Sequence, residues 1–248
     1  MRRLLLPAVV AFLVTGCGSG SSSSQVSVEG PIGKGADQVW VFWPPGEPKD
    51  VVVFIHGLGQ GELTPANHRP WLEHLAAQGS AVLYPRYEAQ LGQRNAVLHI
   101  LAGVHKGLAR VHARRLPLVA IGYSRGGELV ADYAALARGV GPAPRVVLSV
   151  FPGTVDPADP PLDLRTIDRH TRLTILVGDR DAVVDGAGAR QLLQRLAGAS
   201  FPAAQVSLVV IRSRPGLIVT HLAPLEITEA AKTAFWGRAD RMIARARR

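Results

Sequence analysis

Cysteine is nearly absent from this chain of 248 residues, since it occurs only once, as Cys17. No disulfide can form within the chain, and a metal site built from clustered cysteines is excluded. The eight histidines form no H-E-x-x-H or similar metal-binding spacing, so we expect no metal site. Charged residues are also sparse, at 19%, whereas 47% of the residues are apolar. The chain can therefore bury one sizeable core.

Acidic residues are outnumbered, because 28 Lys and Arg stand against 19 Asp and Glu, which gives a formal net charge of +9. A basic balance is compatible with binding to nucleic acid or to an anionic membrane surface. The arginines are scattered over helix-like stretches, apart from a basic end over residues 238–248. No zinc-finger spacing and no aromatic–basic RNA-binding motif is present. We therefore expect a solvated basic surface and no nucleic-acid partner.

The N-terminal segment predicts a compartment. Residues 1–16 contain two arginines, an apolar run of about a dozen residues and then small residues, which is the order of a secretory signal peptide and is short for a membrane span. The run L-V-T-G-C resembles a bacterial lipobox, in which Cys17 becomes the lipid-modified N-terminus. The alternative is an ordinary signal peptide cleaved nearby. The lipobox resemblance implies secretion and lipid anchoring to a membrane of the bacterial cell envelope.

A flexible linker and one folded domain are predicted after the N-terminal segment. Residues 18–24 (G-S-G-S-S-S-S) have the composition of a flexible linker. We predict a signal peptide over residues 1–16, a lipid-anchored flexible linker over 17–37, and one folded domain over 38–248.

Short apolar runs alternate with longer amphipathic stretches in the predicted domain. The predicted strands cover residues 39–43, 51–55, 81–84, 118–121, 146–151, 173–177 and 206–211. The predicted helices cover residues 68–78, 95–114, 125–138 and 187–196, and a further helix starts near Pro224. Such alternation predicts an α/β fold with a mostly parallel central sheet and helices on both faces. In such sheets the functional site lies at the carboxyl ends of the strands.

One of these strand ends carries G-Y-S-R-G, residues 122–126. A serine in a sharp turn between a strand and a helix presents its hydroxyl at the start of the helix, and the two glycines allow the helix and strand to approach closely. This context predicts Ser124 as a nucleophile. The alternative is a serine that only caps the helix.

The other strand ends supply the remaining parts of a hydrolytic site. H-G-L-G-Q-G at residues 56–61 predicts a turn whose Leu58 amide, with the Arg125 amide, forms an oxyanion hole; the alternative is a simple strand-ending turn. G-D-R-D-A-V-V-D at residues 178–185 offers three acids, Asp179, Asp181 and Asp185. His221 is the one histidine that follows both the last strand and these acids, which predicts it as the base.

These four segments, in this order, resemble the α/β-hydrolase superfamily, and the resemblance covers about residues 38–248. The chain is most similar to small esterases and dienelactone-hydrolase-like members. The superfamily pattern G-x-x-D-x-x-V selects Asp181 as the acid that orients His221. The resemblance implies that Ser124 forms an acyl-enzyme with a small-molecule ester, without a metal or organic cofactor.

Residues 152–172 form a short interval where lipase-like members usually carry a lid, so we expect no sizeable lid and an open site suited to short or exposed esters. Arg125, beside the nucleophile, is predicted to place a guanidinium at the rim of the site, where it either favours anionic or polar substrates or points to solvent. A peptidase, thioesterase, lipase or acyltransferase of the same chemistry remains an alternative. A non-catalytic surface-binding lipoprotein on the same fold is another.

Overall fold

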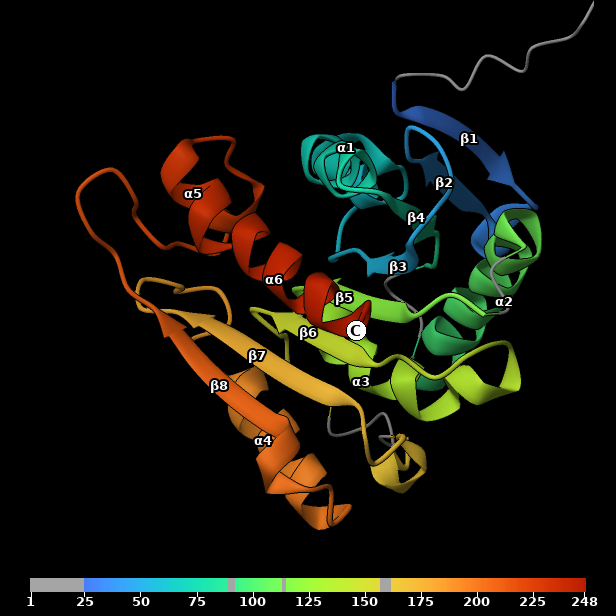
Figure 1. Cartoon of the computed structure of the whole chain (residues 1–248). Helices are drawn as coiled ribbons and strands as arrows, with labels where there is room; N and C mark the ends of the chain where they lie inside the picture. Colours follow the sequence, from blue (N-terminus) through green and yellow to red (C-terminus); the bar gives the residue numbers. More distant parts are fainter. Residues whose placement is uncertain (1–24, 89–91, 113–114, 157–161) are drawn as a thin grey trace, which may run out of the picture.

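The computed structural model describes residues 25–88, 92–112, 115–156 and 162–248. Within these residues the chain folds around a sheet of eight strands in the order β1-β2-β4-β3-β5-β6-β7-β8 (Figure 1). The strands are β1 Ser27–Ile32, β2 Val39–Trp43, β3 Asp50–Ile55, β4 Ser80–Pro85, β5 Leu118–Tyr123, β6 Val146–Val150, β7 Arg172–Gly178 and β8 Val206–Ile211. The α-helices are α1 Arg69–Ala77, α2 Gln93–Val111, α3 Arg125–Leu136, α4 Ala187–Gly198, α5 Glu229–Ala234 and α6 Trp236–Ala246. The predicted signal peptide and Cys17 lie outside the described residues.

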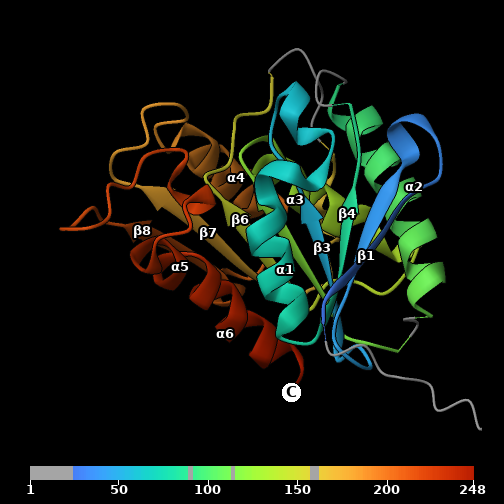
Figure 2. The ribbon, with the colours of Figure 1, turned by 90° about the horizontal axis from the view of Figure 1, so that it is seen from above.

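The sheet separates two apolar cores. Along β3, Val51 and Val53 face a core shared with α2, α3 and α4. The intervening Val52 and Phe54 face a second core shared with α1 and α6. Alternate residues of a strand point to opposite faces, so a strand that is apolar throughout is buried on both sides. The three-layer arrangement predicted from the sequence is therefore confirmed, with helices on both faces of the sheet (Figure 2).

The direction of the strands places the candidate site. β4, β3, β5, β6, β7 and β8 run parallel to one another, whereas β2 is antiparallel to both β1 and β4. The six parallel strands therefore end at one edge of the sheet, which we call the carboxyl edge. The segments that follow β3, β5, β7 and β8 all leave the sheet there, as the sequence predicts.

The folded domain begins earlier than predicted. Residues 27–32, assigned above to the flexible linker, form β1 and pair with β2 at one edge of the sheet. Their sequence S-V-E-G-P-I contains a glycine and a proline and no apolar alternation, which hides the strand. An edge strand tolerates Pro31 because its N–H side needs no partner.

The C-terminal segment also differs from the prediction. Near Pro224 the chain forms only a 3-10 turn, Ala223–Leu225. α5 begins later, at Glu229, where the Thr228 hydroxyl accepts a hydrogen bond from the Ala231 amide. Proline suits the first turn of either helix type because its missing N–H has no partner there, so it could not distinguish the two.

No helix among the described residues is both long and apolar enough to cross a bilayer. Between β6 and β7, the described residues 151–156 and 162–171 contain one 3-10 turn, Leu164–Thr166, and no helical lid. This agrees with the short interval seen in the sequence. The carboxyl edge is therefore not covered by any described helix inserted at this point.

Close packing of α3 against the sheet depends on two glycines. A Cβ atom on Gly126 would lie 2.0 Å from the Ile55 carbonyl oxygen and 2.4 Å from that of His56, and one on Gly122 would lie 2.1 Å from the Gly126 oxygen. Each approach is to backbone, which cannot rotate away. We expect Gly126→Ala to lower the free energy of unfolding by about 3 kcal/mol, because backbone must shift to admit the methyl group.

Gly198, near the end of α4, is the matched control, since a Cβ atom there meets nothing within 4 Å. Gly198→Ala should leave stability unchanged or raise it by about 0.5–1 kcal/mol. Urea unfolding of the two variants checks both expectations. A Gly126→Ala protein as stable as the wild type would contradict the close approach.

Candidate active site

Ser124 occupies the turn between β5 and α3. Its φ of 55° and ψ of −118° lie outside the regions that non-glycine residues usually adopt, which is the strained geometry expected at a reactive serine. The turn is held by its backbone: the Ser124 amide donates to the Val150 carbonyl at 2.9 Å, and the Ser124 carbonyl accepts from the Gly153 amide at 3.1 Å.

The side chain of Ser124 does not cap the helix. It is at the N-cap position of α3 but makes no capping hydrogen bond. Its Oγ lies instead 2.9 Å from Nε2 of His221. This contact favours the nucleophile interpretation over the helix-cap alternative.

His221 reaches the serine from the loop that follows β8. Only 8% of the residue is exposed, and its Nδ1 lies 2.8 Å from Oδ2 of Asp181. The Tyr123 hydroxyl donates a hydrogen bond to the His221 carbonyl at 2.8 Å, which fixes the histidine loop to the end of β5. With Nδ1 donating to the carboxylate, Nε2 is the acceptor for the serine hydroxyl.

Asp181 is the acid that meets the histidine. While Oδ2 faces His221, Oδ1 accepts hydrogen bonds from the amides of Val183 at 3.0 Å and Val184 at 3.2 Å. The carboxylate is therefore fully engaged and only 5% of the residue is exposed. The structure thus brings together the three residues predicted as a triad, from the ends of β5, β7 and β8.

The two alternative acids lie elsewhere. Asp179 is exposed and accepts hydrogen bonds from the Ser213 amide at 2.9 Å and hydroxyl at 2.6 Å; these bonds hold the pKa of the Asp179 carboxyl below its usual value. Asp185 is exposed with a left-handed φ of 43°. Asp185 does not cap the following helix either, because the N-cap of α4 is Gly186 and no side chain caps it.

The H-G-L-G turn lies beside the serine. A Cβ atom on Gly57 would lie 3.3 Å from Cβ of Ser124, so the backbone after β3 passes next to the nucleophile. Leu58 follows and exposes 65% of its surface, while Arg125 is the first residue of α3. The structure places both predicted oxyanion-hole residues next to Ser124 or Gly57; their role as amide donors stays a prediction.

A buried polar network supports this turn, and the sequence reasoning missed it. His56 donates from Nδ1 to the Gly57 carbonyl at 2.8 Å and stacks on Tyr87 at 4.3 Å. The Tyr87 hydroxyl donates to the His56 carbonyl at 2.7 Å. Burial lowers the pKa of His56 to about 4, so the ring is neutral at pH 7. Hydrogen bonds from the buried His56 and Tyr87 side chains therefore fix the backbone of the turn after β3.

A second pair extends the network. The Glu62 carboxylate is buried beside Nε2 of His68 and accepts from the Asn67 side-chain amide at 3.0 Å. The Glu62 carbonyl accepts from the Tyr84 hydroxyl at 2.7 Å. The sequence signal was a carboxylate and a histidine six residues apart, directly after the H-G-L-G turn. This sequence signal is weak because a carboxylate and a histidine at this spacing can have many other roles.

The structure pairs Arg125 with an acid, and the effect of Arg125 on substrate preference stays a prediction. Its guanidinium pairs with the Glu128 carboxylate one turn further along α3, and the two side chains are only 15% and 3% exposed. The charge of Arg125 is therefore matched within the protein and does not simply point to solvent. Burial raises the pKa of Glu128 to about 7, although Arg125 opposes this shift. An acid–base spacing of i, i+3 on a helix is the sequence signal that could have found the pair.

The structure offers no metal centre in the part of the chain it describes: no group of three or more His, Cys, Asp or Glu there could hold an ion. No family model matches the chain, and no curated protein matches it in sequence. Several solved structures, however, share its architecture.

Three of these solved structures illustrate the likeness. Esterase B from Lactobacillus rhamnosis, inhibited by a tributyrin phosphonate, has a TM-score of 0.67 at 16% identity over 90% of this chain and 86% of the esterase. A protein from Klebsiella pneumoniae that is provisionally named a dienelactone hydrolase has a TM-score of 0.59 at 16% identity. The match covers 84% of this chain and 92% of the Klebsiella chain. Thermogutta terrifontis esterase 2, phosphoramylated by tabun, has a TM-score of 0.59 at 14% identity over 90% and 95%.

The chain has the α/β-hydrolase fold. In this fold the nucleophile follows a central strand and the partners occur in the chain order serine, acid, histidine. Ser124, Asp181 and His221 have that order and meet at the carboxyl edge. The α/β-hydrolase fold predicted from the four segments is therefore confirmed.

Proposed function

We propose that this chain is a serine hydrolase that cleaves carboxylic esters through an acyl-enzyme intermediate. The observation that carries the proposal is the unbroken series of contacts from Asp181 through His221 to Ser124, at 2.8 Å and 2.9 Å. A serine hydroxyl is too basic to attack an ester unaided, and a histidine in this position can take its proton. The names of the structural neighbours, two esterases and a dienelactone hydrolase, agree with this reaction class.

The proposed reaction has two steps. Ser124 Oγ attacks the ester carbonyl carbon while His221 Nε2 takes the hydroxyl proton, and Asp181 stabilises the resulting imidazolium. The amides of Leu58 and Arg125 stabilise the negative oxygen, and loss of one such donor in a hydrolase costs about 3 kcal/mol of barrier. The alkoxide leaves with the proton from His221. Water, deprotonated by the same histidine, then releases the acid and restores the serine.

Short or exposed esters are the proposed substrates. No lid helix is present among the described residues between β6 and β7, so a long acyl chain would have little apolar cover. Esterase B was crystallised with a tributyrin phosphonate, which is in keeping with short acyl groups. The competing proposals are peptidase, thioesterase or acyltransferase activity at the same triad, and a binding module without activity.

A fluorophosphonate probe tests the proposal directly. The expected result is one covalent adduct, which peptide mapping places on Ser124, and turnover of ester substrates that falls as the acyl chain lengthens. Amide and thioester substrates of matched acyl groups separate peptidase and thioesterase activity from ester cleavage. A folded protein that takes no probe and turns over no ester would leave the binding module as the surviving proposal.

We also propose that the chain is secreted and anchored by a lipid on Cys17. The support is the sequence alone, a signal-like segment followed by L-V-T-G-C. Mass analysis of the N-terminal peptide of the mature protein should find an acylated Cys17. A mature protein that retains Met1 would contradict the proposal.

A further inference from the structure

A hollow lined by positive charge lies at the end of the sheet opposite the candidate active site. It has a volume of about 550 Å³ and lies where β6 and β7 begin, against the last turn of α6. Its lining consists of Arg145, Val146, His170, Arg172, Arg245, Ala246 and Arg248. Four of these seven residues are arginines, one is a histidine and none is acidic.

Among the described residues, the four arginines form no ion pair. The nearby Asp168, which lines an adjoining hollow with Arg145 and His170, pairs with Arg138. None of the four arginines has a carboxylate within 4.0 Å in the described part of the chain, in contrast to Arg247, which pairs with the buried Asp50 from the same end of α6. Arg145 donates instead to the Ala246 carbonyl at 2.8 Å, which fixes its guanidinium at the wall of the hollow. Gathered like charges repel one another, and an anion bound between them removes that repulsion.

The helix dipole explains only part of this cluster. Arg245 lies in the last turn of α6, where a positive charge offsets the partial negative charge of the helix end. Arg145, which directly precedes β6, also meets this helix end through its hydrogen bond to the Ala246 carbonyl. Arg172 starts β7, and no contact among the described residues ties its side chain to a helix end. The convergence of Arg172 and His170 on the same hollow therefore indicates an anion site in addition to helix stabilisation.

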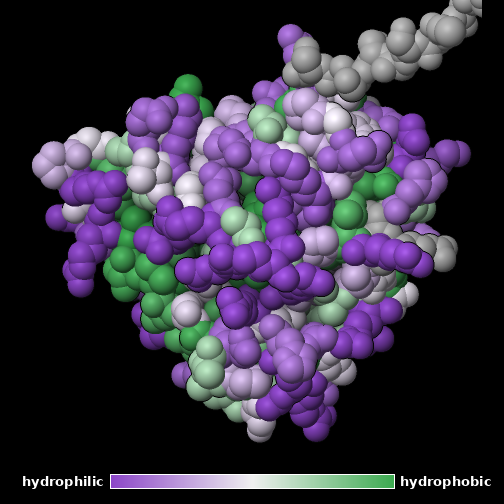
Figure 3. Space-filling model, in the orientation of Figure 1, coloured by the Kyte–Doolittle hydropathy of each residue, from purple (hydrophilic) through white to green (hydrophobic). Residues whose placement is uncertain are grey.

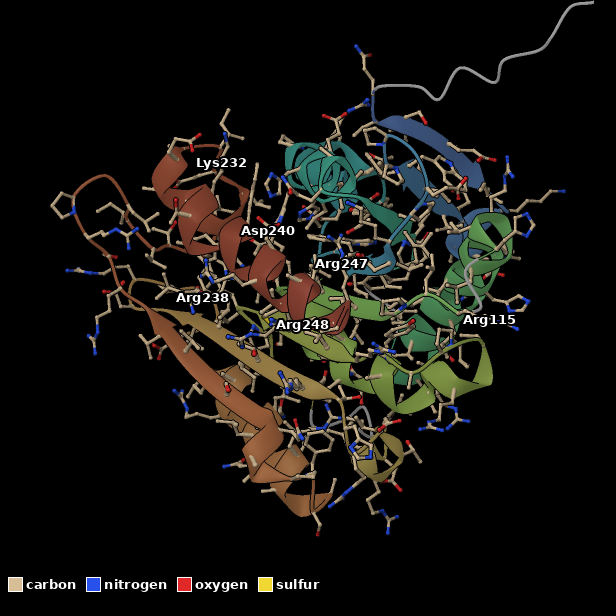
Figure 4. The ribbon with its side chains drawn as sticks, viewed as in Figure 1. Arg115, Lys232, Arg238, Asp240, Arg247 and Arg248 are labelled. Atoms are coloured by element: carbon tan, nitrogen blue, oxygen red, sulfur yellow. The ribbon has the colours of Figure 1, made fainter. Side chains whose placement is uncertain are left out.

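The positive surface extends from the last turn of α6 to the starts of the neighbouring strands. Figure 3 shows a hydrophilic band over α6, and Figure 4 labels Asp240 within this helix and Arg248 just beyond its end. A neighbouring hollow of about 330 Å³ shares Arg172 and Arg245 with the first. Such a patch can contact several anionic groups on one surface.

The patch lies at the end of the domain where the described chain enters. β1 runs parallel to β4, because both are antiparallel to β2, so Ser27 lies at the end where the parallel strands begin. Figure 2 shows the C-terminus and the start of β1 at this same end, away from the strand arrowheads. The ten residues from Cys17 to Ser27 can span at most about 35 Å, so a membrane anchor at Cys17 would hold this end toward the bilayer.

We propose that this arginine-lined hollow binds the phosphate group of an anionic phospholipid headgroup, so that the domain rests on a bilayer with its carboxyl edge facing away. Guanidinium groups bind phosphate oxygens through paired hydrogen bonds, and juxtamembrane arginines are attracted to anionic lipid surfaces. The inference is independent of the proposed ester hydrolysis. It leaves the Ser124 site open to substrate from the aqueous side.

Vesicle binding of the full chain tests this inference. Cys17→Ser is included throughout, so that no attached lipid anchors the protein, and the apolar N-terminal segment contributes equally to every variant. We expect tighter binding to vesicles that contain phosphatidylglycerol than to vesicles of phosphatidylcholine alone. The difference should shrink as salt rises from about 0.1 M to about 1 M, where the Debye length falls from about 10 Å to about 3 Å.

The decisive variant is Arg172→Gln with Arg245→Gln. Each arginine removed should weaken binding to the anionic vesicles about fivefold, and the pair about 25-fold. The matched control is Arg94→Gln with Arg190→Gln, two exposed arginines that make no ion pair with other described residues and lie near the starts of α2 and α4. The control should bind as the parent does, because the same net charge is removed at the far end of the domain.

Inorganic pyrophosphate separates the two possible sources of the phosphate group. If pyrophosphate raises the melting temperature of the parent but not of the Arg172/Arg245 variant, while anionic vesicles bind neither, the site takes a soluble phosphorylated ligand and the membrane part of the proposal is wrong. If the Arg172/Arg245 variant and the control respond alike to both probes, the hollow is not a phosphate site and the inference is overturned.

Discussion

Replacing Ser124 with alanine should lower the turnover of an activated ester about a millionfold. The Oγ atom that lies 2.9 Å from His221 Nε2 is then missing, so the proposed nucleophile is lost. A residual rate of about 10³–10⁴ over the uncatalysed reaction should remain, because the oxyanion hole and substrate binding survive. The variant should also fail to react with a fluorophosphonate.

The fold should tolerate this change. Alanine carries a Cβ atom as serine does, so the substitution adds no new steric conflict at a φ of 55°. The Ser124 side chain caps no helix, so the melting temperature should stay close to that of the wild type. Ser207→Ala, on the exposed part of β8, is the matched control and should keep full turnover. If Ser124→Ala hydrolyses esters at a rate near the wild type's, the nucleophile lies elsewhere and the proposed mechanism is wrong.

The central strands were predictable because their sequences allow one interpretation. The apolar run at residues 51–55 is buried on both faces, and few structures other than an interior parallel strand suit such a run. β1 was missed because an edge strand needs neither continuous apolar residues nor every backbone hydrogen bond. Tertiary pairing with β2, and not local preference, makes residues 27–32 a strand.

The residues of the candidate site were likewise only partly predictable from the sequence. Parallel strands end at a common edge, so residues far apart in the sequence, such as Ser124 and His221, could be expected to meet. The Glu62–His68 pair beside the H-G-L-G turn could not be expected, because its geometry depends on how the 3-10 turns that follow β3 fold. Arg125 was predicted at the rim, but its charge partner Glu128 was overlooked although it lies one helical turn away.

The choice among the acids depends on a turn that the sequence does not describe. Asp179 and Asp181 are two residues apart, and β7 ends at Gly178. The pattern G-x-x-D selects Asp181 by resemblance only. In the structure the chain turns after Gly178, so Asp179 meets Ser213, close to the end of β8, while Asp181 meets His221 further along the same loop.

We therefore expect Asp181→Asn to lower ester turnover about ten-thousandfold while the protein stays folded. An asparagine side chain offers an N–H where the carboxylate accepted one, which disfavours the tautomer with Nδ1 protonated and leaves Nε2 unable to accept the Ser124 proton. It also removes the negative charge that stabilises the imidazolium. The loss should appear in kcat, since no contact to bound substrate is assigned to Asp181.

Asp179→Asn is the control, because it changes the same chemical group two residues away. Its loss weakens hydrogen bonds to Ser213, which should cost stability of about 1 kcal/mol and change turnover only a few-fold. Circular dichroism and thermal unfolding establish that both variants are folded before turnover on an activated ester is compared. If Asp179→Asn is the slow variant and Asp181→Asn is not, the acid has been misassigned even though Ser124 and His221 keep their roles.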